Sequence, residues 1–217
     1  MSSKITESSK RSDWETPQWL FDELNAIFNF SWDLASSEEN CKVRIPSRGN
    51  IAAGYTETED ALTKDWKSLK GWLWCNPPYK RGKGSHIDFC KKAAGYKSLN
   101  AVFLIPGRLD RWFLDHVLPN GCCYIFPKRL QFELDGKPYT EEWARCRFNT
   151  IYDKIVKRHK KNITDVIKQE DGSTIIHYRM PIEPATFPSA LWLPGYHVVP
   201  HQFQELVAKY DLRRLFA

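Results

Sequence analysis

The tetrapeptide Asn76-Pro77-Pro78-Tyr79 carries the side chains of this chain that are best suited to chemistry. It follows the apolar run WLWC at residues 72–75, which predicts a short buried strand that two prolines end abruptly. The side-chain oxygen of Asn76 is a hydrogen-bond acceptor, and a main-chain carbonyl in the proline turn, most simply that of Pro77, is a second. The flat ring of Tyr79 offers a surface on which a base can stack.

Two acceptors in a rigid turn suit methyl transfer to an amino nitrogen that is conjugated with a ring or a carbonyl. Such a nitrogen is a poor nucleophile, and acceptors that bind its two protons favour its pyramidal, more nucleophilic form. The same pair would serve N6 of adenine in DNA or RNA, N4 of cytosine, or the side-chain amide of a protein glutamine. A purely structural strand-to-loop turn is the alternative without chemistry.

Apolar runs and helical spacings predict the elements that must hold this turn. Thr16 can cap a helix that has Pro17 at its first position, and apolar residues then recur at helical spacing as far as Phe28. The alternation of such segments with apolar strands is typical of an α/β doubly wound, Rossmann-like sheet, mostly parallel. The predicted strands are 30–34, 72–75, 101–105, 122–126, 129–133 and 187–193, and the later predicted helices are 86–95 and 112–117. The strands at 122–126 and 129–133 have no helix between them, which predicts an antiparallel edge strand.

The composition along the chain predicts its division into domains. Residues 1–12 are rich in Ser and Lys and predict a disordered tail. Residues 13–134 and 185–217 are predicted to form the catalytic domain. The basic segment 135–184 is too long and too patterned for a loop, so we interpret it as an inserted subdomain that contains a hairpin with Asp171-Gly172 as its turn.

The order of the motifs resembles that of a known family, the phage-type DNA N6-adenine methyltransferases, which are the Dam-like enzymes of bacteriophages and prophages. Trp14-Glu15-Thr16-Pro17 is similar to the family's N-terminal motif, and Asp33-Leu34-Ala35-Ser36-Ser37 is similar to its first cofactor motif. The remaining matches are Asp60-Ala61-Leu62, Asp65-Trp66, the tetrapeptide at 76–79, Leu104-Ile105-Pro106 with Arg108, Trp112-Phe113, Lys128-Arg129-Leu130 with Phe132, and Phe187-Pro188-Ser189-Ala190. The chain lacks the glycine-rich turn of methyltransferases in general, and its inserted segment is longer than simple members of the family require.

The resemblance implies a class I methyltransferase fold and S-adenosylmethionine as the methyl donor. Thr16 and Pro17, after Glu15, begin a helix whose free amides suit the cofactor carboxylate. Asp33 suits the methionyl ammonium, although it is also placed to cap the next helix. The implied cofactor contacts further along are the small residues Ala35 and Ser36, Asp65 for the cofactor adenine, Trp66 against its ring, and either Asp60 or Glu59 for the ribose. A surface turn acid is the plain alternative for Asp65.

The resemblance also implies double-stranded DNA as the substrate, with the target adenine flipped out of the stack. The formal net charge of +6 favours a polyanionic partner. Basic residues that we expect to meet DNA lie in the loop after the tetrapeptide, after the strand at 101–105, and in the insertion: Lys80, Arg81, Lys83, Arg108, Arg145, Arg147, Arg158 and Lys161. Each is also a plausible solvated charge, and a DNA-binding protein without catalysis is the rival interpretation.

Other classes of function find no support in the residue pattern. The 6 His are scattered without ligand spacing and the 6 Cys form no zinc motif, so no metal site is predicted. No stretch approaches the roughly 20 apolar residues that span a membrane, and we expect a cytoplasmic protein of a bacterium or a phage-infected host. The pattern is compatible with a monomer or a homodimer, and with a role in restriction-modification or in self-protection. It does not specify the DNA sequence that is methylated.

Overall fold

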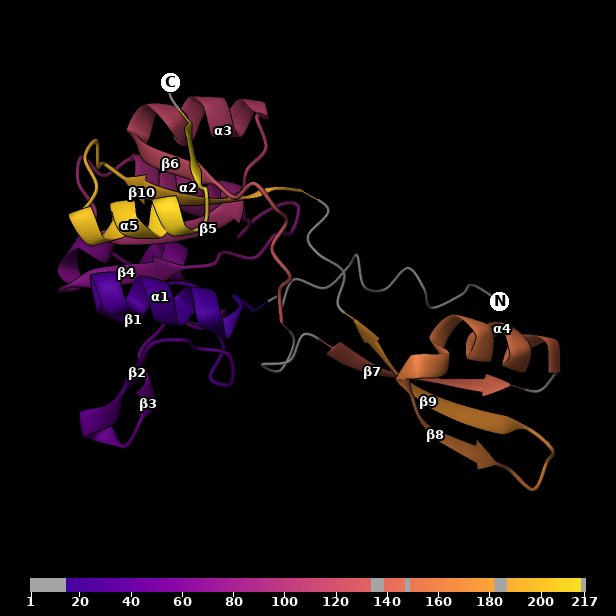
Figure 1. Ribbon diagram of the computed structural model, residues 1–217. Helices are drawn as coiled ribbons and strands as arrows, with labels where there is room; N and C mark the ends of the chain where they lie inside the picture. The colour runs from indigo at the N-terminus through magenta and orange to yellow at the C-terminus, as the bar shows by residue number, and fades with distance from the viewer. Residues whose placement is uncertain (1–14, 134–138, 147–148, 182–186, 216–217) are drawn as a thin grey trace.

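A computed structural model of the chain describes residues 15–133, 139–146, 149–181 and 187–215 (Figure 1). Within these residues, six strands form the main sheet in the order β1-β4-β5-β10-β6-β11. Their bounds are β1 (Phe30–Asp33), β4 (Trp72–Cys75), β5 (Ala101–Pro106), β10 (Ser189–Pro194), β6 (Gly121–Ile125) and β11 (Arg213–Leu215).

The sheet is parallel on the side that carries the predicted motifs. β1 pairs with β4 and β4 pairs with β5 in parallel, so the carboxyl ends of the three strands share one edge. β10 is antiparallel to both β5 and β6, and β11 is antiparallel to β6. The mixed α/β architecture with a largely parallel sheet therefore agrees with the sequence, and it is compatible with a Rossmann-like fold.

The predicted strand at 129–133 is wrong. Within that segment Glu133 makes an isolated antiparallel bridge with Glu15, on the N-terminal side of the first helix. The antiparallel strands of the main sheet are instead β10 and β11, and β10 lies inside the sheet because the chain returns to fill the gap between β5 and β6. The sequence shows the apolar character of β10 but not its place in the strand order.

Helices cover both faces of the sheet, because successive side chains of a buried strand point to opposite sides. On β5, Val102 and Leu104 pack with residues of α1 (Gln18–Phe28) and α5 (His201–Lys209). Phe103 and Ile105 pack on the other face, with residues of α2 (His86–Ala94) and α3 (Arg111–His116). Both faces are thus buried, as a doubly wound sheet requires.

Short elements complete the main body, which is the six-stranded sheet with the helices that cover it. β2 (Arg44–Ile45) and β3 (Ile51–Ala52) form a small antiparallel hairpin that is joined by the 3-10 helix η2 (Pro46–Arg48). The other 3-10 helices of the main body are η3 (Ala61–Thr63), η4 (Trp66–Ser68) and η5 (Leu118–Asn120).

A second, three-stranded sheet is built from the predicted insertion, in the order β7-β9-β8 (Figure 1). Its strands are β7 (Tyr139–Cys146), β8 (Ile163–Lys168) and β9 (Thr174–Pro181). Between β7 and β8 the chain forms α4 (Asn149–His159) and η6 (Lys160–Asn162). β8 and β9 pair antiparallel across a turn in which Gly172 has a φ of 75°, so the predicted hairpin and its Asp171-Gly172 turn are confirmed. The boundaries proposed for the domains stay a prediction, and the N-terminal tail lies outside the described residues.

In the part of the chain that the structure describes, no helix has the length and apolar character that crossing a membrane requires.

Candidate active site

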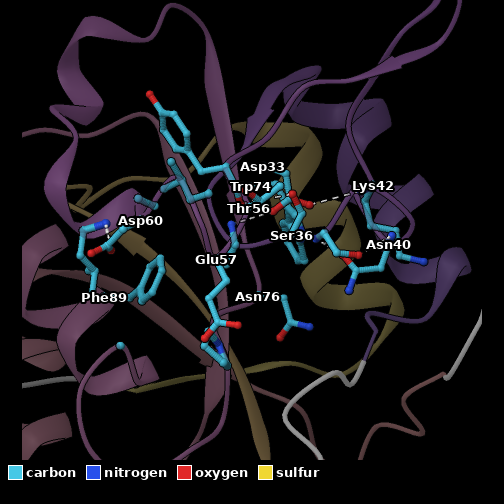
Figure 2. A pocket seen from close by; sticks show the side chains of 18 of the residues that line it. Asp33, Ser36, Asn40, Lys42, Thr56, Glu57, Asp60, Trp74, Asn76 and Phe89 are labelled. Atoms are coloured by element: carbon cyan, nitrogen blue, oxygen red, sulfur yellow. Dashed lines mark hydrogen bonds between the residues drawn. The ribbon is translucent and has the colours of Figure 1, made fainter.

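A pocket of about 570 Å³ opens at the carboxyl ends of β1 and β4 (Figure 2). Its volume is that of an ordinary small-molecule site, and its place is the usual one in a doubly wound sheet. It is lined by Glu15, Thr16, Asp33, Leu34, Ala35, Ser36, Ser37, Glu38, Asn40, Lys42, Tyr55, Thr56, Glu57, Thr58, Asp60, Ala61, Leu62, Trp74, Asn76, Pro78, Lys80, Lys83, Gly84 and Phe89. Figure 2 shows Asp60 and Phe89 on one side of this space, Asn40 and Lys42 on the other, and Asn76 apart from both.

Asp33, the last residue of β1, lines this pocket with only 2% of its surface exposed. The main-chain N–H groups of Ala35 and Lys42 donate to its carboxylate at 3.1 and 3.2 Å. Burial raises the pKa of the carboxyl to about 6, against the lowering effect of the two N–H donors and of the Lys42 charge. An almost fully desolvated carboxylate with this pKa is well suited to a cationic ligand, which would restore the favourable interaction that water no longer supplies.

The segment 53–55 packs against Asp33 and against the turn of small residues that follows it. The N–H of Asp33 donates to the Ala53 carbonyl, and the N–H of Tyr55 donates to the Asp33 carbonyl, both at 2.8 Å. Gly54, between them, has no room for a side chain: a Cβ would lie 2.4 Å from Ser36 Oγ and 2.9 Å from the Asp33 carbonyl oxygen. The floor of the pocket therefore depends on close approach of two backbones, which glycine allows.

At the N-terminal wall of the pocket, the prediction that Thr16 caps the first helix is wrong. α1 begins at Gln18 with Pro17 as its N-cap residue, so Thr16 does not cap the helix. The N–H of Gln18 donates to the Glu133 carboxylate at 3.3 Å. The hydroxyl of Thr16 is buried, with 1% of the residue exposed, and has no hydrogen-bond partner among the described residues.

An ion pair between Lys42 and Glu15 lies at the same wall of the pocket. Lys42 Nζ lies 3.3 Å from the Glu15 carboxylate, and both side chains are largely buried. Lys42 Nζ also donates to Gln18 Oε1 at 3.2 Å, so the lysine connects the turn after β1 to the start of α1. Glu15, Thr16 and Asp33, which the sequence predicted together, do line one pocket, whereas Pro17 is buried outside its lining.

The tetrapeptide at 76–79 forms the corner between β4 and α2. Asn76 and Pro78 line the pocket, whereas Pro77 is buried behind it. The Pro78 carbonyl already accepts from the N–H groups of Lys80 at 2.9 Å and His86 at 3.0 Å. For the Pro77 carbonyl, no hydrogen bond is found within the described residues. The Pro77 carbonyl is therefore better placed than the Pro78 carbonyl to accept a further hydrogen bond.

Tyr79 is held by its hydroxyl and by three rings. The hydroxyl donates to the Leu104 carbonyl at 2.9 Å, and burial raises its pKa well above the usual value, so it remains a donor. His86, Phe132 and Phe187 meet the Tyr79 ring at steep angles, with centroids 5.8, 5.8 and 5.5 Å away. The ring does not line the pocket described above, and it is fixed at the adjoining side of the corner.

Asp65 and Trp66 are not brought to the pocket. The Asp65 carboxylate accepts from the Lys67 N–H at 3.1 Å and caps η4. This is the alternative role of a surface turn acid that the sequence left open. Trp66 is fully buried, and its indole N–H donates to the Ala61 carbonyl at 2.8 Å. These residues support the wall from behind. Of the two acids considered for a ribose, Asp60 lines the pocket, whereas Glu59 binds the N–H and hydroxyl of Thr56.

The basic residues expected to meet DNA fall into different surroundings. Lys80 and Lys83 line the pocket, and Lys80 Nζ lies 3.3 Å from the exposed carboxylate of Glu57. Arg81 is exposed beyond the lining. Arg108 is exposed as well, and its guanidinium lies 4.9 Å from the Phe187 ring centroid.

The basic residues of the insertion are less uniform. Arg145 is used within the second sheet, where it bonds to Asp171 at 3.2 Å and to Ser173 Oγ at 3.1 Å. Lys161 is exposed in η6, and Arg158 belongs to α4. Arg147 lies outside the described residues. Structural ion pairing thus occupies Arg145.

The pocket residues fit S-adenosylmethionine by the chemistry of their polar groups. A buried carboxylate at one end suits an ammonium group, and the buried Thr16 hydroxyl lacks a partner that a polar ligand would supply. Asp60, Ala61 and Leu62 at the other end combine a carboxylate with apolar surface, as a ribose and an adenine ring require. No group of three or more His, Cys, Asp or Glu side chains is arranged for a metal ion in the described ranges.

A largely parallel sheet with a ligand-sized pocket beyond its first two parallel strands defines an α/β protein that is compatible with a Rossmann-like fold. The family model described as "DNA N-6-adenine-methyltransferase (Dam)" matches residues 3–174, and the chain belongs to this family. A search of curated proteins and a search of solved structures found no match. The family membership that the motifs indicated is therefore confirmed, and this membership implies DNA adenine methylation as the activity.

Sequence reasoning missed several residues of the pocket. Asn40, Lys42, Tyr55, Thr56 and Glu57 come from a loop-rich stretch without periodicity. Gly54 was the available signal, because an isolated glycine inside a short apolar run such as residues 51–55 can mark a close backbone approach. Its partner, however, lies about twenty residues earlier at the end of β1, which local patterns do not reveal.

Replacing Asp33 with Asn should change the pH dependence of stability. The folded-state pKa of about 6 exceeds the ordinary 3.8, so the folded protein gains a proton relative to the unfolded chain between these pH values. The contribution of this extra proton to the unfolding free energy is fully present below pH 3.8 and is lost as the pH rises through 6. Relative to wild type, Asp33→Asn should therefore gain about 2 to 3 kcal/mol in unfolding free energy from pH 4 to pH 7.

Urea unfolding without ligand at the two pH values measures this difference. Asp22→Asn, which replaces an exposed carboxylate on α1, is the control. An Asp33→Asn difference that is the same at both pH values would contradict the assignment of a buried, raised-pKa carboxyl.

Proposed function

We propose that the chain transfers a methyl group from S-adenosylmethionine to N6 of an adenine that is flipped out of double-stranded DNA. The observation that carries this proposal is that Asp33 and Asn76, on neighbouring parallel strands, line one pocket. Family membership supports the reaction, and the pocket supports the division of labour between a cofactor end and a transfer end.

The cofactor end would be built from five residues of the pocket. Asp33 would hold the methionyl ammonium, and the Thr16 hydroxyl would bond to the same part of the ligand. Ala35 and Ser36 leave the backbone accessible, and Asp60 would bind ribose hydroxyls. When bound, S-adenosylmethionine supplies an electrophilic methyl group on a sulfonium sulfur.

The transfer end uses two acceptors at the proline corner. Asn76 Oδ1 and the Pro77 carbonyl would accept the two protons of the adenine amino group, which favours a pyramidal nitrogen with its lone pair available. The Pro78 carbonyl is engaged by Lys80 and His86, which supports Pro77 as the second acceptor and keeps the corner rigid. A strong base is unnecessary, because an alkylated amino nitrogen is acidic and loses its proton to water.

DNA would approach along the basic side of this corner. Lys80, Arg81 and Lys83 follow the tetrapeptide and would contact phosphates beside the flipped nucleotide. The second sheet, with its exposed Lys160 and Lys161, is our candidate for contacts further along the duplex. Tyr79, fixed by its hydroxyl bond to Leu104, would form a rigid wall for the base.

Asn76→Ala should lower the rate of DNA methylation by roughly 100- to 1000-fold, because one of two preorganised acceptors is lost. Plasmid DNA incubated with S-adenosylmethionine and read by modification-sensitive sequencing gives both the modified base and its sequence context. The control is thermal stabilisation by S-adenosylhomocysteine, which the variant should retain. A variant as fast as wild type, or methyl groups found only on cytosine or on RNA, would refute the proposal.

Thr16→Val should stabilise the ligand-free protein and weaken cofactor binding at the same time. The buried hydroxyl lacks a partner among the described residues, so its removal should raise the unfolding free energy by roughly 1 kcal/mol. The affinity for S-adenosylhomocysteine should fall roughly fivefold to tenfold. Urea unfolding and titration calorimetry measure the two effects, and loss of stability with unchanged affinity would show a purely structural role.

Lys160→Ala combined with Lys161→Ala should reduce the dependence of DNA affinity on salt. Each lost phosphate contact lowers the magnitude of the slope of log affinity against log salt by about 1. The charge-matched control is Lys70→Ala with Lys97→Ala, since these exposed lysines precede β4 and β5 at the opposite edge of the sheet. Equal slopes for the two double variants would argue against DNA contact by η6.

A further inference from the structure

The loop after β5 presents an exposed apolar side chain beside the proposed active site. β5 ends at Pro106, and Leu109, three residues further on, has 65% of its surface exposed. β5 is the parallel neighbour of β4, whose carboxyl end carries Asn76, so both ends lie at the same edge of the sheet. The carbonyl of Leu104, near the end of β5, also holds the hydroxyl of Tyr79.

The start of this loop is fixed against the rest of the protein. The N–H of Gly107 donates to the Pro188 carbonyl at 2.7 Å, and a Cβ at Gly107 would lie 2.9 Å from Ile125 Cδ1. The guanidinium of Arg108 then lies over the Phe187 ring, which itself contacts Tyr79. The loop is therefore connected to the wall of the transfer site through two successive ring contacts.

The end of the loop is fixed as well. Asp110 is the N-cap residue of α3, and its carbonyl accepts from the N–H groups of Phe113 at 2.9 Å and Leu114 at 3.1 Å. Leu109 thus projects from a short segment that is held at both sides. Because the backbone on both sides of Leu109 is already fixed, less entropy is lost when this segment binds another molecule.

We propose that Leu109 enters the DNA duplex and fills the space that the flipped adenine leaves. Apolar side chains of this size are suited to insertion between base steps, where they replace the lost stacking. Arg108 and the exposed Arg111 lie on either side of Leu109 in the chain and would meet the flanking phosphates. This inference rests on the proposed function and assigns to Leu109 a positioning role in it.

The charges around Leu109 favour nucleic acid over a protein partner. Two arginines flank a single leucine, whereas a protein interface of useful size needs a contiguous apolar patch. Asp110 and Asp115 are the nearby acids: Asp110 begins α3, and Asp115 pairs with Arg111 Nε at 3.4 Å. An exposed ion pair of this kind is weak and exchanges readily for a phosphate.

Leu109→Ala should slow methylation of a normally paired adenine and spare an adenine that is already unpaired. The substrates are two duplexes around a site found by plasmid sequencing, one with thymine opposite the target adenine and one with an abasic residue there. On the paired duplex kcat/KM should fall about 10- to 100-fold, as expected for loss of most of a leucine's apolar contact. On the abasic duplex the loss should stay within about threefold, because flipping is easier there.

Leu114→Ala is the matched control, since Leu114 on α3 is also exposed, at 48%, and lies one turn further along the chain. It should behave as wild type on both duplexes. A second measurement uses 2-aminopurine in place of the target adenine, whose fluorescence rises on flipping. Leu109→Ala should reduce this rise, with an unchanged thermal stabilisation by S-adenosylhomocysteine.

The outcomes separate this inference from the proposed function. Equal losses on the two duplexes, or no loss on the paired one, would overturn the role of Leu109 while wild-type methylation of adenine still supports the enzyme. If wild type methylates neither duplex nor plasmid DNA, the proposed function itself fails, and the inference fails with it.

Discussion

Asp33 is a carboxylate that the fold removes almost entirely from water, and the cofactor end of the pocket is organised around it. Its own N–H and C=O bond to the segment 53–55, and its side chain accepts from two further N–H groups. Gly54 makes this possible, because any side chain there would collide with Ser36 and with the Asp33 carbonyl. Burial of the charge opposes folding, as the raised pKa shows, and a bound ammonium group would remove that penalty. The stability of the free protein and its affinity for a cationic ligand are thus linked.

The transfer end depends on α2 in a comparable way. Asp88, in the first turn of this helix, accepts from the N–H of Gly84 at 2.8 Å and so fixes the end of the basic loop. Further along, Lys92 donates to the Leu62 carbonyl at 2.7 Å and supports the wall that carries Asp60. One helix therefore holds both the proline corner and the far side of the pocket, which keeps the two ends of the proposed reaction at a constant separation.

Charge is distributed unevenly between the pocket and the chain as a whole. The chain carries a formal net charge of +6, yet the pocket is lined by five acids and three lysines, namely Glu15, Asp33, Glu38, Glu57 and Asp60 with Lys42, Lys80 and Lys83. Under the proposed function this distribution suits both ligands, because the positively charged methyl donor would lie near the acids and the DNA phosphates would meet the basic residues Lys80, Arg81 and Lys83 after the proline corner. The Lys80–Glu57 pair lies where the two regions meet.

The sequence by itself determined the local features: the apolar runs of β4, β5 and β10, the proline corner after β4, the hairpin turn at Gly172, and through the order of motifs the family. It also indicated Thr16, Asp33 and Asn76, because each follows or precedes a strong local pattern. Only the tertiary structure decided which residues surround them. Backbone pairing over about twenty residues brings Gly54 to Asp33, strand order places β10 inside the sheet, and Asp65 caps η4 away from the pocket. Such long-range pairing is set by how the whole chain buries its apolar surface, so no short window of sequence contains it.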